Sequence, residues 1–171
     1  GYRMEHKFVN LKMVAQVAGA LQELLPQMVF VGGASISMYT DDKAADEIRP
    51  TDDIDMTIQL AGYTAWTQMQ ERLLQLGFSP DPEAKNIFRY LYKKIAVDIM
   101  PSEDGPIGKS NSWYKPGFEH LQKATVETVE INILSAPYFL ATKLEAFHDR
   151  GGDYRTSHDF EDIIYVLDNR T

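Results

Sequence analysis

The segment RPTDDIDMTI, residues 49–58, constrains the fold of this chain more than any other stretch. From Ile54 onward apolar residues alternate with polar ones, which is the period of a β-strand with one buried face. On such a strand Asp53 and Asp55 project from the same face, with their Cα atoms roughly 7 Å apart. Two carboxylates held so close repel each other, so either one of them is protonated or a cation lies between them. A divalent metal ion is the common cation in such a position.

A third carboxylate, Asp98, lies in the apolar segment KKIAVDIMP. Apolar residues again alternate, so the period predicts a strand, and an aspartate within it is costly unless it is paired, bound to a metal or exposed at the strand end. If this strand lies beside the Asp53/Asp55 strand, the three carboxylates form a cluster. Such a cluster suits two Mg²⁺ ions, which prefer oxygen ligands and share their coordination with phosphate and water. Two ions of this kind activate an attacking oxygen and stabilise a leaving pyrophosphate.

Two glycines, Gly32 and Gly33, join the apolar strand MVFV to the short helix expected for ASISMYT. Glycine lets the backbone approach a ligand closely, and free N–H groups at the start of a helix favour an anion such as phosphate. Ser35 adds a hydroxyl at the same place. A glycine pair is also typical of a plain tight turn, so this feature alone does not define a site.

The composition excludes several classes of protein. A chain of 171 residues is expected to form one domain with a real core. Its net charge of −8 argues against a surface that coats nucleic acid generally, although a local basic groove remains compatible with it. The sequence has no cysteine, which removes disulfides and Cys-ligated zinc, and no apolar run near the ~20 residues that a membrane span needs. We therefore expect a soluble, cytoplasmic protein with no membrane partner.

The order of predicted elements indicates an α/β (α+β) fold with a short mixed β-sheet flanked by helices. Residues 1–135 would form the core, and residues 136–171 a small C-terminal helical segment packed on it. Residues 40–49 and 102–112 are expected to be loops. Helices are predicted at 11–25, 34–40, 64–78, 136–150 and 157–168, with strands at 28–31 and 54–58, a hairpin at 87–100 that turns near Lys93-Lys94, and one or two strands within 125–135.

In this order, the motifs resemble the polymerase-beta-like nucleotidyltransferase superfamily over roughly residues 29–167. That superfamily has Gly-Gly or Gly-Ser after the first strand, Asp-x-Asp or Asp-x-Glu on the second, and a third carboxylate on a later strand. The matching residues here are Gly32-Gly33 with Ser35, Asp53 with Asp55, and Asp98. Within the superfamily, the sequence is most similar to the AbiEii/AbiGii-type group known from abortive-infection and toxin–antitoxin systems.

That group tends to carry Arg-x-Thr-x-Asp-Ile-Asp, which Arg49, Thr51, Asp53, Ile54 and Asp55 fit position by position. It also tends to carry a late helix with a lysine, then an arginine, then Asp-x-x-Asp. Those positions correspond here to Lys143, Arg150 or Arg155, Asp159 and Asp162.

The resemblance implies a role for each matched residue. Asp53, Asp55 and Asp98 would bind two Mg²⁺ ions, and Lys143 would reach the triphosphate of an NTP while Asp159 helps to hold or orient it. The remaining nucleotide-binding residues would be Gly32, Gly33, Ser35, Arg49 and Thr51. The late lysine and aspartates are equally compatible with a solvated helix face bearing weak exposed ion pairs.

The resemblance thus implies a Mg²⁺-dependent nucleotidyltransferase that moves a nucleoside monophosphate from NTP to a hydroxyl acceptor. The acceptor would be an RNA or tRNA end, a protein or a small molecule, and the enzyme would be the toxin paired with a cognate antitoxin. One alternative is a small-molecule enzyme of the aminoglycoside-modifying type, whose cationic acceptor the charge of −8 would suit. Another is a non-catalytic interaction module that retains the fold, against which the three intact carboxylates argue.

Overall fold

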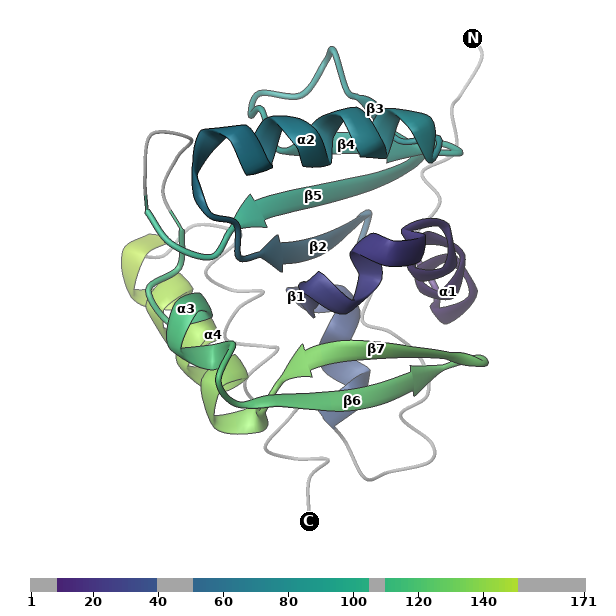
Figure 1. Cartoon of the computed structure of the whole chain (residues 1–171). Coiled ribbons are helices and arrows are strands. Elements are labelled where there is room, and N and C mark those ends of the chain that lie inside the picture. The colour runs from purple at the N-terminus through teal and green to yellow at the C-terminus, as the bar shows by residue number, and fades with distance from the viewer. Residues whose placement is uncertain (1–8, 40–50, 105–109, 151–171) are drawn as a thin grey trace, which may run out of the picture.

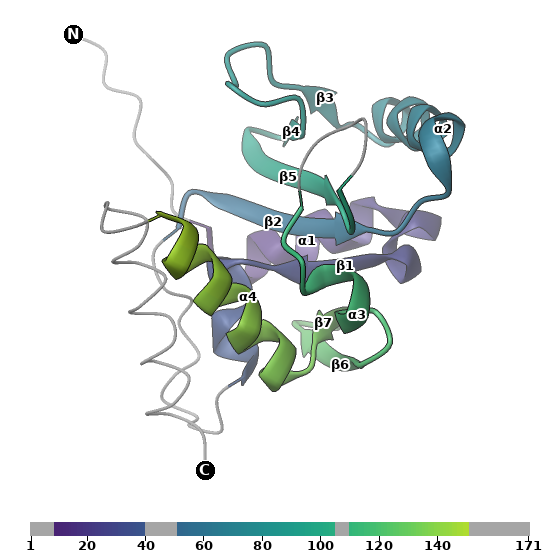
Figure 2. The same cartoon turned by 90° about the vertical axis from the view of Figure 1, so that its left-hand side faces the viewer.

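A seven-stranded mixed β-sheet forms the centre of the protein, with helices on both faces (Figures 1 and 2). The computed structural model describes residues 9–39, 51–104 and 110–150. The helices are α1 (Leu11–Ala20), the 3₁₀ helices η1 (Gln22–Gln27) and η2 (Gly33–Tyr39), α2 (Gly62–Gln75), α3 (Tyr114–Gly117) and α4 (Ala136–Arg150). The strands are β1 (Met28–Val31), β2 (Asp53–Ile58), β3 (Ser79–Pro80), β4 (Arg89–Tyr92), β5 (Ile95–Pro101), β6 (Leu121–Val126) and β7 (Val129–Leu134). This architecture confirms the α/β class with a mixed sheet.

The strand order is β3-β4-β5-β2-β1-β7-β6. Strand β1 pairs antiparallel with β2 and parallel with β7, and β2 pairs parallel with β5. The remaining neighbours are antiparallel, including the hairpins β4–β5 and β6–β7. Because β2 and β5 run in the same direction and β1 runs against them, the end of β1 lies beside the start of β2.

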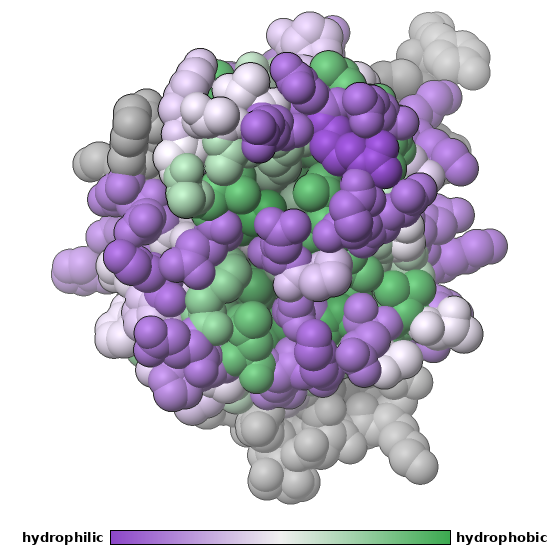
Figure 3. All heavy atoms as spheres, in the orientation of Figure 1, coloured by the Kyte–Doolittle hydropathy of each residue, from purple (hydrophilic) through white to green (hydrophobic). Residues whose placement is uncertain are grey.

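The two faces of the sheet are covered by different helices. Helices α1 and α2 lie on one face, and η2 and α4 on the other (Figures 1 and 2). On β2 the apolar Ile54 and Met56 are fully buried whereas Asp53 and Asp55 are partly exposed, which confirms the predicted alternation over these four residues; Thr57, on the same face as the aspartates, is buried as well. In the orientation of Figure 1, hydrophilic side chains cover most of the molecule, and apolar side chains show between them near the middle (Figure 3).

Helix α1 is shorter than the predicted helix at 11–25. It begins at the Asn10 side chain, which accepts a hydrogen bond from the Met13 N–H at 2.9 Å. It ends at Ala20, because Gln22 adopts a left-handed φ of 49°, and the chain continues as the tighter η1. Pro26 lies inside η1, where its missing N–H and its effect on the preceding residue disfavour an α-helix. The predicted helix was therefore wrong over its last turn.

The other predictions for the described residues agree with the structure, with adjusted ends. The β4–β5 hairpin turns at Lys93 and Lys94, which both have positive φ. Helix α2 ends just before Gly77, and the later hairpin has two strands, starting at Leu121. The helix expected at 34–40 is the 3₁₀ helix η2.

Helix α4 packs on the core through Phe139, whose ring stacks on Tyr39 of η2 at 4.3 Å between centroids. The helix predicted at 157–168 and the loop at 40–49 lie outside the described residues, so the boundary at residue 135 stays a prediction. Within the described part of the chain, no helix combines the length and the apolar character required to cross a bilayer.

Candidate metal and nucleotide site

The three predicted aspartates converge on adjacent parallel strands. In the register of β2 with β5, Asp55 lies directly opposite Asp98, and Asp53 is two residues back on the same face of β2. One oxygen atom from each of the three carboxylates lies within 4.8 Å of the other two. The chain thus brings residues 53, 55 and 98 to one point of the sheet, as the sequence pattern predicted.

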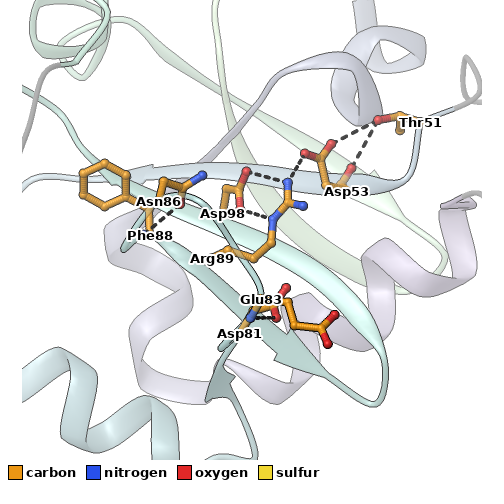
Figure 4. Close-up of polar contacts among 8 residues, drawn as sticks. All are labelled: Thr51, Asp53, Asp81, Glu83, Asn86, Phe88, Arg89 and Asp98. Atoms are coloured by element: carbon orange, nitrogen blue, oxygen red, sulfur yellow. Dashed lines mark hydrogen bonds and ion pairs between the residues drawn. The ribbon is translucent and has the colours of Figure 1, made fainter.

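A fourth charged residue, Arg89, lies among these carboxylates and was not singled out from the sequence. Its Nε donates to Asp98 Oδ1 at 2.8 Å, and its Nη2 donates to Asp98 Oδ2 at 3.0 Å. The same Nη2 donates to Asp53 Oδ2 at 2.8 Å, so the guanidinium bridges two strands (Figure 4). Ionic hydrogen bonds of this forked kind are stronger than neutral ones.

The sequence held a signal for Arg89. A two-residue turn at Lys93-Lys94 fixes the register of the β4–β5 hairpin, so counting outward from the turn pairs residue 92 with 95 and residue 89 with 98. A cation directly opposite the third aspartate could therefore have been found once the turn was placed.

The glycine pair predicted a close approach of the backbone to a ligand. In the structure, the backbone of Gly32 lies close to the side chain of Asp55. Its φ is +74°, and a Cβ at this position would lie 2.3 Å from Asp55 Oδ2 and 2.9 Å from Asp55 Cβ. The register that places Val31 opposite Asp55 brings the two residues together. A side chain at position 32 would therefore displace the carboxylate.

Two hydroxyl groups contact the site residues in ways that the sequence did not predict. Thr51 Oγ1 donates to Asp53 Oδ1 at 3.2 Å and so helps to orient that carboxylate (Figure 4). Ser35 is buried, and its hydroxyl donates to the Gly32 carbonyl oxygen at 2.9 Å. In this structure Thr51 supports an acidic side chain and Ser35 supports the glycine turn; contacts of either residue with phosphate stay predictions.

The environment disfavours negative charge on two of the aspartates. Burial, followed by repulsion from Asp53 and Asp98, raises the pKa of Asp55 well above its usual value, although Lys143 and Arg89 act in the opposite direction. Burial and the charge of Asp98 likewise raise the pKa of Asp53. The hydrogen bond to Asp98 raises the pKa of Arg89 further, which keeps its guanidinium charged. Burial first, and then repulsion between the carboxylates, thus oppose deprotonation of Asp53 and Asp55.

Lys143 reaches the same region from α4. It is only 8% exposed, its ammonium lies 5.7 Å from the centre of the Phe139 ring, and its charge lowers the pKa of Asp55. The structure thus places Lys143 close enough to the cluster to influence it. Arg49 and Asp159, the other predicted nucleotide and catalytic residues, lie outside the described residues.

The donor set fits a hard divalent cation. Three carboxylates supply oxygen ligands at one point, and additional positive charge would favour the charged form of Asp55, which burial and the neighbouring carboxylates disfavour. The guanidinium of Arg89 already occupies the position of a cation between Asp53 and Asp98. Asp53, Asp55 and Asp98 are therefore the residues that would hold Mg²⁺.

Solved structures identify the class of fold. The chain is similar to an antigenic nucleotidyltransferase-like protein from Paracoccidioides brasiliensis, with a TM-score of 0.62 and 17% identity over 92% of this chain and 75% of that one. It is also similar to ANT(2")-Ia in complex with adenylyl-2"-tobramycin, with a TM-score of 0.57 and 14% identity over 92% of this chain and 88% of that one. The fold is that of the nucleotidyltransferases.

A family model is more specific than these structural likenesses. Residues 17–171 match the family described as "Nucleotidyl transferase AbiEii toxin, Type IV TA system". The chain belongs to the AbiEii nucleotidyltransferase family, as its motifs indicated. No curated protein has a matching sequence.

Proposed function

We propose that this protein is a Mg²⁺-dependent enzyme that transfers a nucleoside monophosphate from an NTP to a hydroxyl acceptor and releases pyrophosphate. The observation that carries the proposal is the convergence of three carboxylates on one face of adjacent strands. Membership of a nucleotidyltransferase family gives that cluster its chemical context. The alternative of a non-catalytic module is disfavoured because all three carboxylates are present and brought together.

In the proposed mechanism, Asp53, Asp55 and Asp98 would hold the metal ions. Bound Mg²⁺ would supply positive charge that lowers the pKa of the acceptor hydroxyl and stabilises the leaving pyrophosphate. The protein keeps this region partly dry, because Asp98 is only 13% exposed and Asp53 21% exposed. Electrostatic interactions are stronger there than in bulk water.

Other residues are assigned to the nucleotide. Lys143 is assigned to the triphosphate from the family resemblance, and two observations support this: it belongs to α4, which lies on the face of the sheet opposite α1 and α2 (Figure 2), and its charge lowers the pKa of Asp55. Gly33 and Ser35 follow the turn that contacts Asp55, so they would hold the β- and γ-phosphates beside the metal ligands. Arg49 and Asp159 complete the proposed set on the basis of the family resemblance.

We further propose a toxin role with a cognate antitoxin as partner, in the cytoplasm, because the family is described as a toxin of a toxin–antitoxin system. The acceptor proposed first is an RNA or tRNA end, with a protein acceptor as a variant. A small cationic acceptor is the second candidate, since the net charge is −8 and the fold is shared with ANT(2")-Ia.

Isothermal titration of each NTP in the presence of Mg²⁺ tests the proposal. The wild type is expected to bind at least one NTP, and the Asp53→Asn/Asp55→Asn double variant should lose this binding. Asp81→Asn is the matched control, because Asp81 lies on the β3–β4 connection and its carboxylate accepts the Glu83 N–H. Binding that is equal in the double variant and in the control would contradict the proposed site.

Transfer itself is tested with an NTP labelled at its α-phosphate. Incubation with total tRNA, with protein acceptors and with aminoglycosides should move the label to one of these classes in a Mg²⁺-dependent manner. Transfer to tRNA would support the first candidate and transfer to an aminoglycoside the second. NTP binding without transfer to any acceptor would favour the interaction-module alternative.

A further inference from the structure

The guanidinium of Arg89 binds two of the three carboxylates that the proposed function assigns to metal ions. It makes three hydrogen bonds of 2.8 to 3.0 Å to Asp53 and Asp98, using one oxygen of Asp53 and both oxygens of Asp98. Figure 4 shows it pointing between the two carboxylates from β4. Oxygens that accept these bonds have fewer lone pairs left for a metal ion.

The position of Arg89 is fixed by the backbone and not by a flexible loop. The backbone of Arg89 pairs directly with that of Asp98 in the β4–β5 hairpin. The arginine therefore stays near the cluster even if its side chain gives up its present contacts. Side-chain rotation alone can move the guanidinium off Asp53. Its planar fork matches phosphate oxygens as well as it matches carboxylates, so it can exchange one for the other.

The charges of the site favour such an exchange. The guanidinium offsets part of the negative charge of the three carboxylates and binds three of their oxygens, so divalent cations bind less strongly while the arginine remains in place. The polyphosphate of an NTP brings additional negative charge. It can accept the hydrogen bonds of Arg89 and release the oxygens of Asp53 and Asp98 for the metal.

We propose that Arg89 is a positioning residue that competes with divalent metal for Asp53 and Asp98 and transfers its hydrogen bonds to the polyphosphate when the nucleotide binds. This inference rests on the proposed function and adds a residue to it. Its consequence is that metal and nucleotide bind cooperatively, because each one makes the site more favourable for the other. Such coupling is reciprocal by thermodynamic necessity.

The test is a titration with Mn²⁺ in the absence of nucleotide, in which the EPR signal of the free ion measures how much Mn²⁺ is bound. Arg89→Gln removes the competing charge, so we expect Mn²⁺ to bind about tenfold more tightly than to the wild type. Arg89→Lys keeps the charge but cannot form the fork across both carboxylates, so its affinity should fall between the two. Arg72→Gln is the matched control, because Arg72 also pairs with a carboxylate, Glu23, but on the exposed surface between α2 and η1.

A second titration with a non-hydrolysable NTP analogue measures the coupling. In the wild type the analogue should increase Mn²⁺ affinity by a larger factor than in Arg89→Gln. Circular dichroism of each variant establishes that it is folded, and Arg89→Lys keeps the test decisive if Arg89→Gln does not fold.

The outcomes separate this inference from the proposed function. Equal Mn²⁺ affinity in the wild type and in both Arg89 variants, or weaker binding in the variants, would overturn the role of Arg89 and leave the metal site intact. No Mn²⁺ binding to any of the proteins, with or without the analogue, would overturn both.

Discussion

Replacing Gly32 by alanine tests the contact between the glycine turn and the metal ligands. The left-handed φ of +74° costs an alanine roughly 1–2 kcal/mol. Its Cβ would also lie 2.3 Å from Asp55 Oδ2, and overpacking of this kind costs about 1–3 kcal/mol. We therefore expect Gly32→Ala to lower the free energy of unfolding by roughly 2–5 kcal/mol, measured by urea denaturation.

Two other glycines separate these contributions. Gly62 has a φ of +86°, and no atom lies within 4 Å of the position that an alanine Cβ would take there, so Gly62→Ala should show the cost of the backbone conformation alone, about 1–2 kcal/mol. Gly19 lies in α1 with open space around it, so Gly19→Ala should stabilise the protein by about 0.5–1 kcal/mol.

The same variants should differ in metal binding. Gly32→Ala displaces the Asp55 carboxylate and is expected to weaken Mn²⁺ binding, whereas Gly62→Ala and Gly19→Ala should leave it unchanged. If Gly32→Ala destabilises the protein no more than Gly62→Ala does, the overlap with Asp55 is absent and the reasoning from this contact fails.

Two further predictions concern the ligands themselves. Thr51→Val removes the hydrogen bond to Asp53 and should weaken Mn²⁺ binding about 10–100-fold, whereas Thr67→Val, which removes a hydroxyl that donates to the Tyr63 carbonyl in α2, should not; equal effects would contradict a specific role of Thr51. Because the pKa of Asp55 is raised, the metal-free native state holds this proton to a higher pH than the unfolded chain does. The contribution of Asp55 to stability is therefore complete below the unfolded pKa of about 3.9 and is lost as the pH rises through the pKa of the folded state. Urea denaturation without metal should therefore show the stability of Asp55→Asn rising relative to the wild type as pH increases above about 4, and a difference that does not change with pH would contradict the assigned cause.

The carboxylate cluster could be predicted because strand periodicity is a local signal. Alternation in DIDMTI and IAVDIMP fixes which side chains share a face, and burial of the apolar set leaves the aspartates on the other. The family resemblance then supplied what periodicity cannot, namely that the two strands are neighbours. The structure confirms that they are, with Asp55 opposite Asp98.

Features that depend on tertiary context were not predictable in the same way. Helix α1 ends where Gln22 adopts a left-handed conformation. Glutamine has no special preference for that conformation, so the local sequence did not indicate this helix end. The parallel pairing of Phe30 with Ile133 joins distant segments and has no local signature either. Arg89 could be predicted in part. Its pairing with Asp98 follows from the position of the hairpin turn, but its contact with Asp53 depends on how β2 packs beside β5 in the sheet.

The strands that carry the acidic site are all synthesised before the C-terminal third of the chain. Strands β1, β2, β4 and β5 all lie within residues 28–101, so a nascent chain holds Asp53, Asp55 and Asp98 before β7 and α4 have been translated. At that stage the Lys143 ammonium, which favours the charge of Asp55, does not yet exist. Arg89 does, on the strand that forms a hairpin with Asp98. Among the described residues, Arg89 is thus a cation bound to Asp53 and Asp98 that is translated before the C-terminal third of the chain.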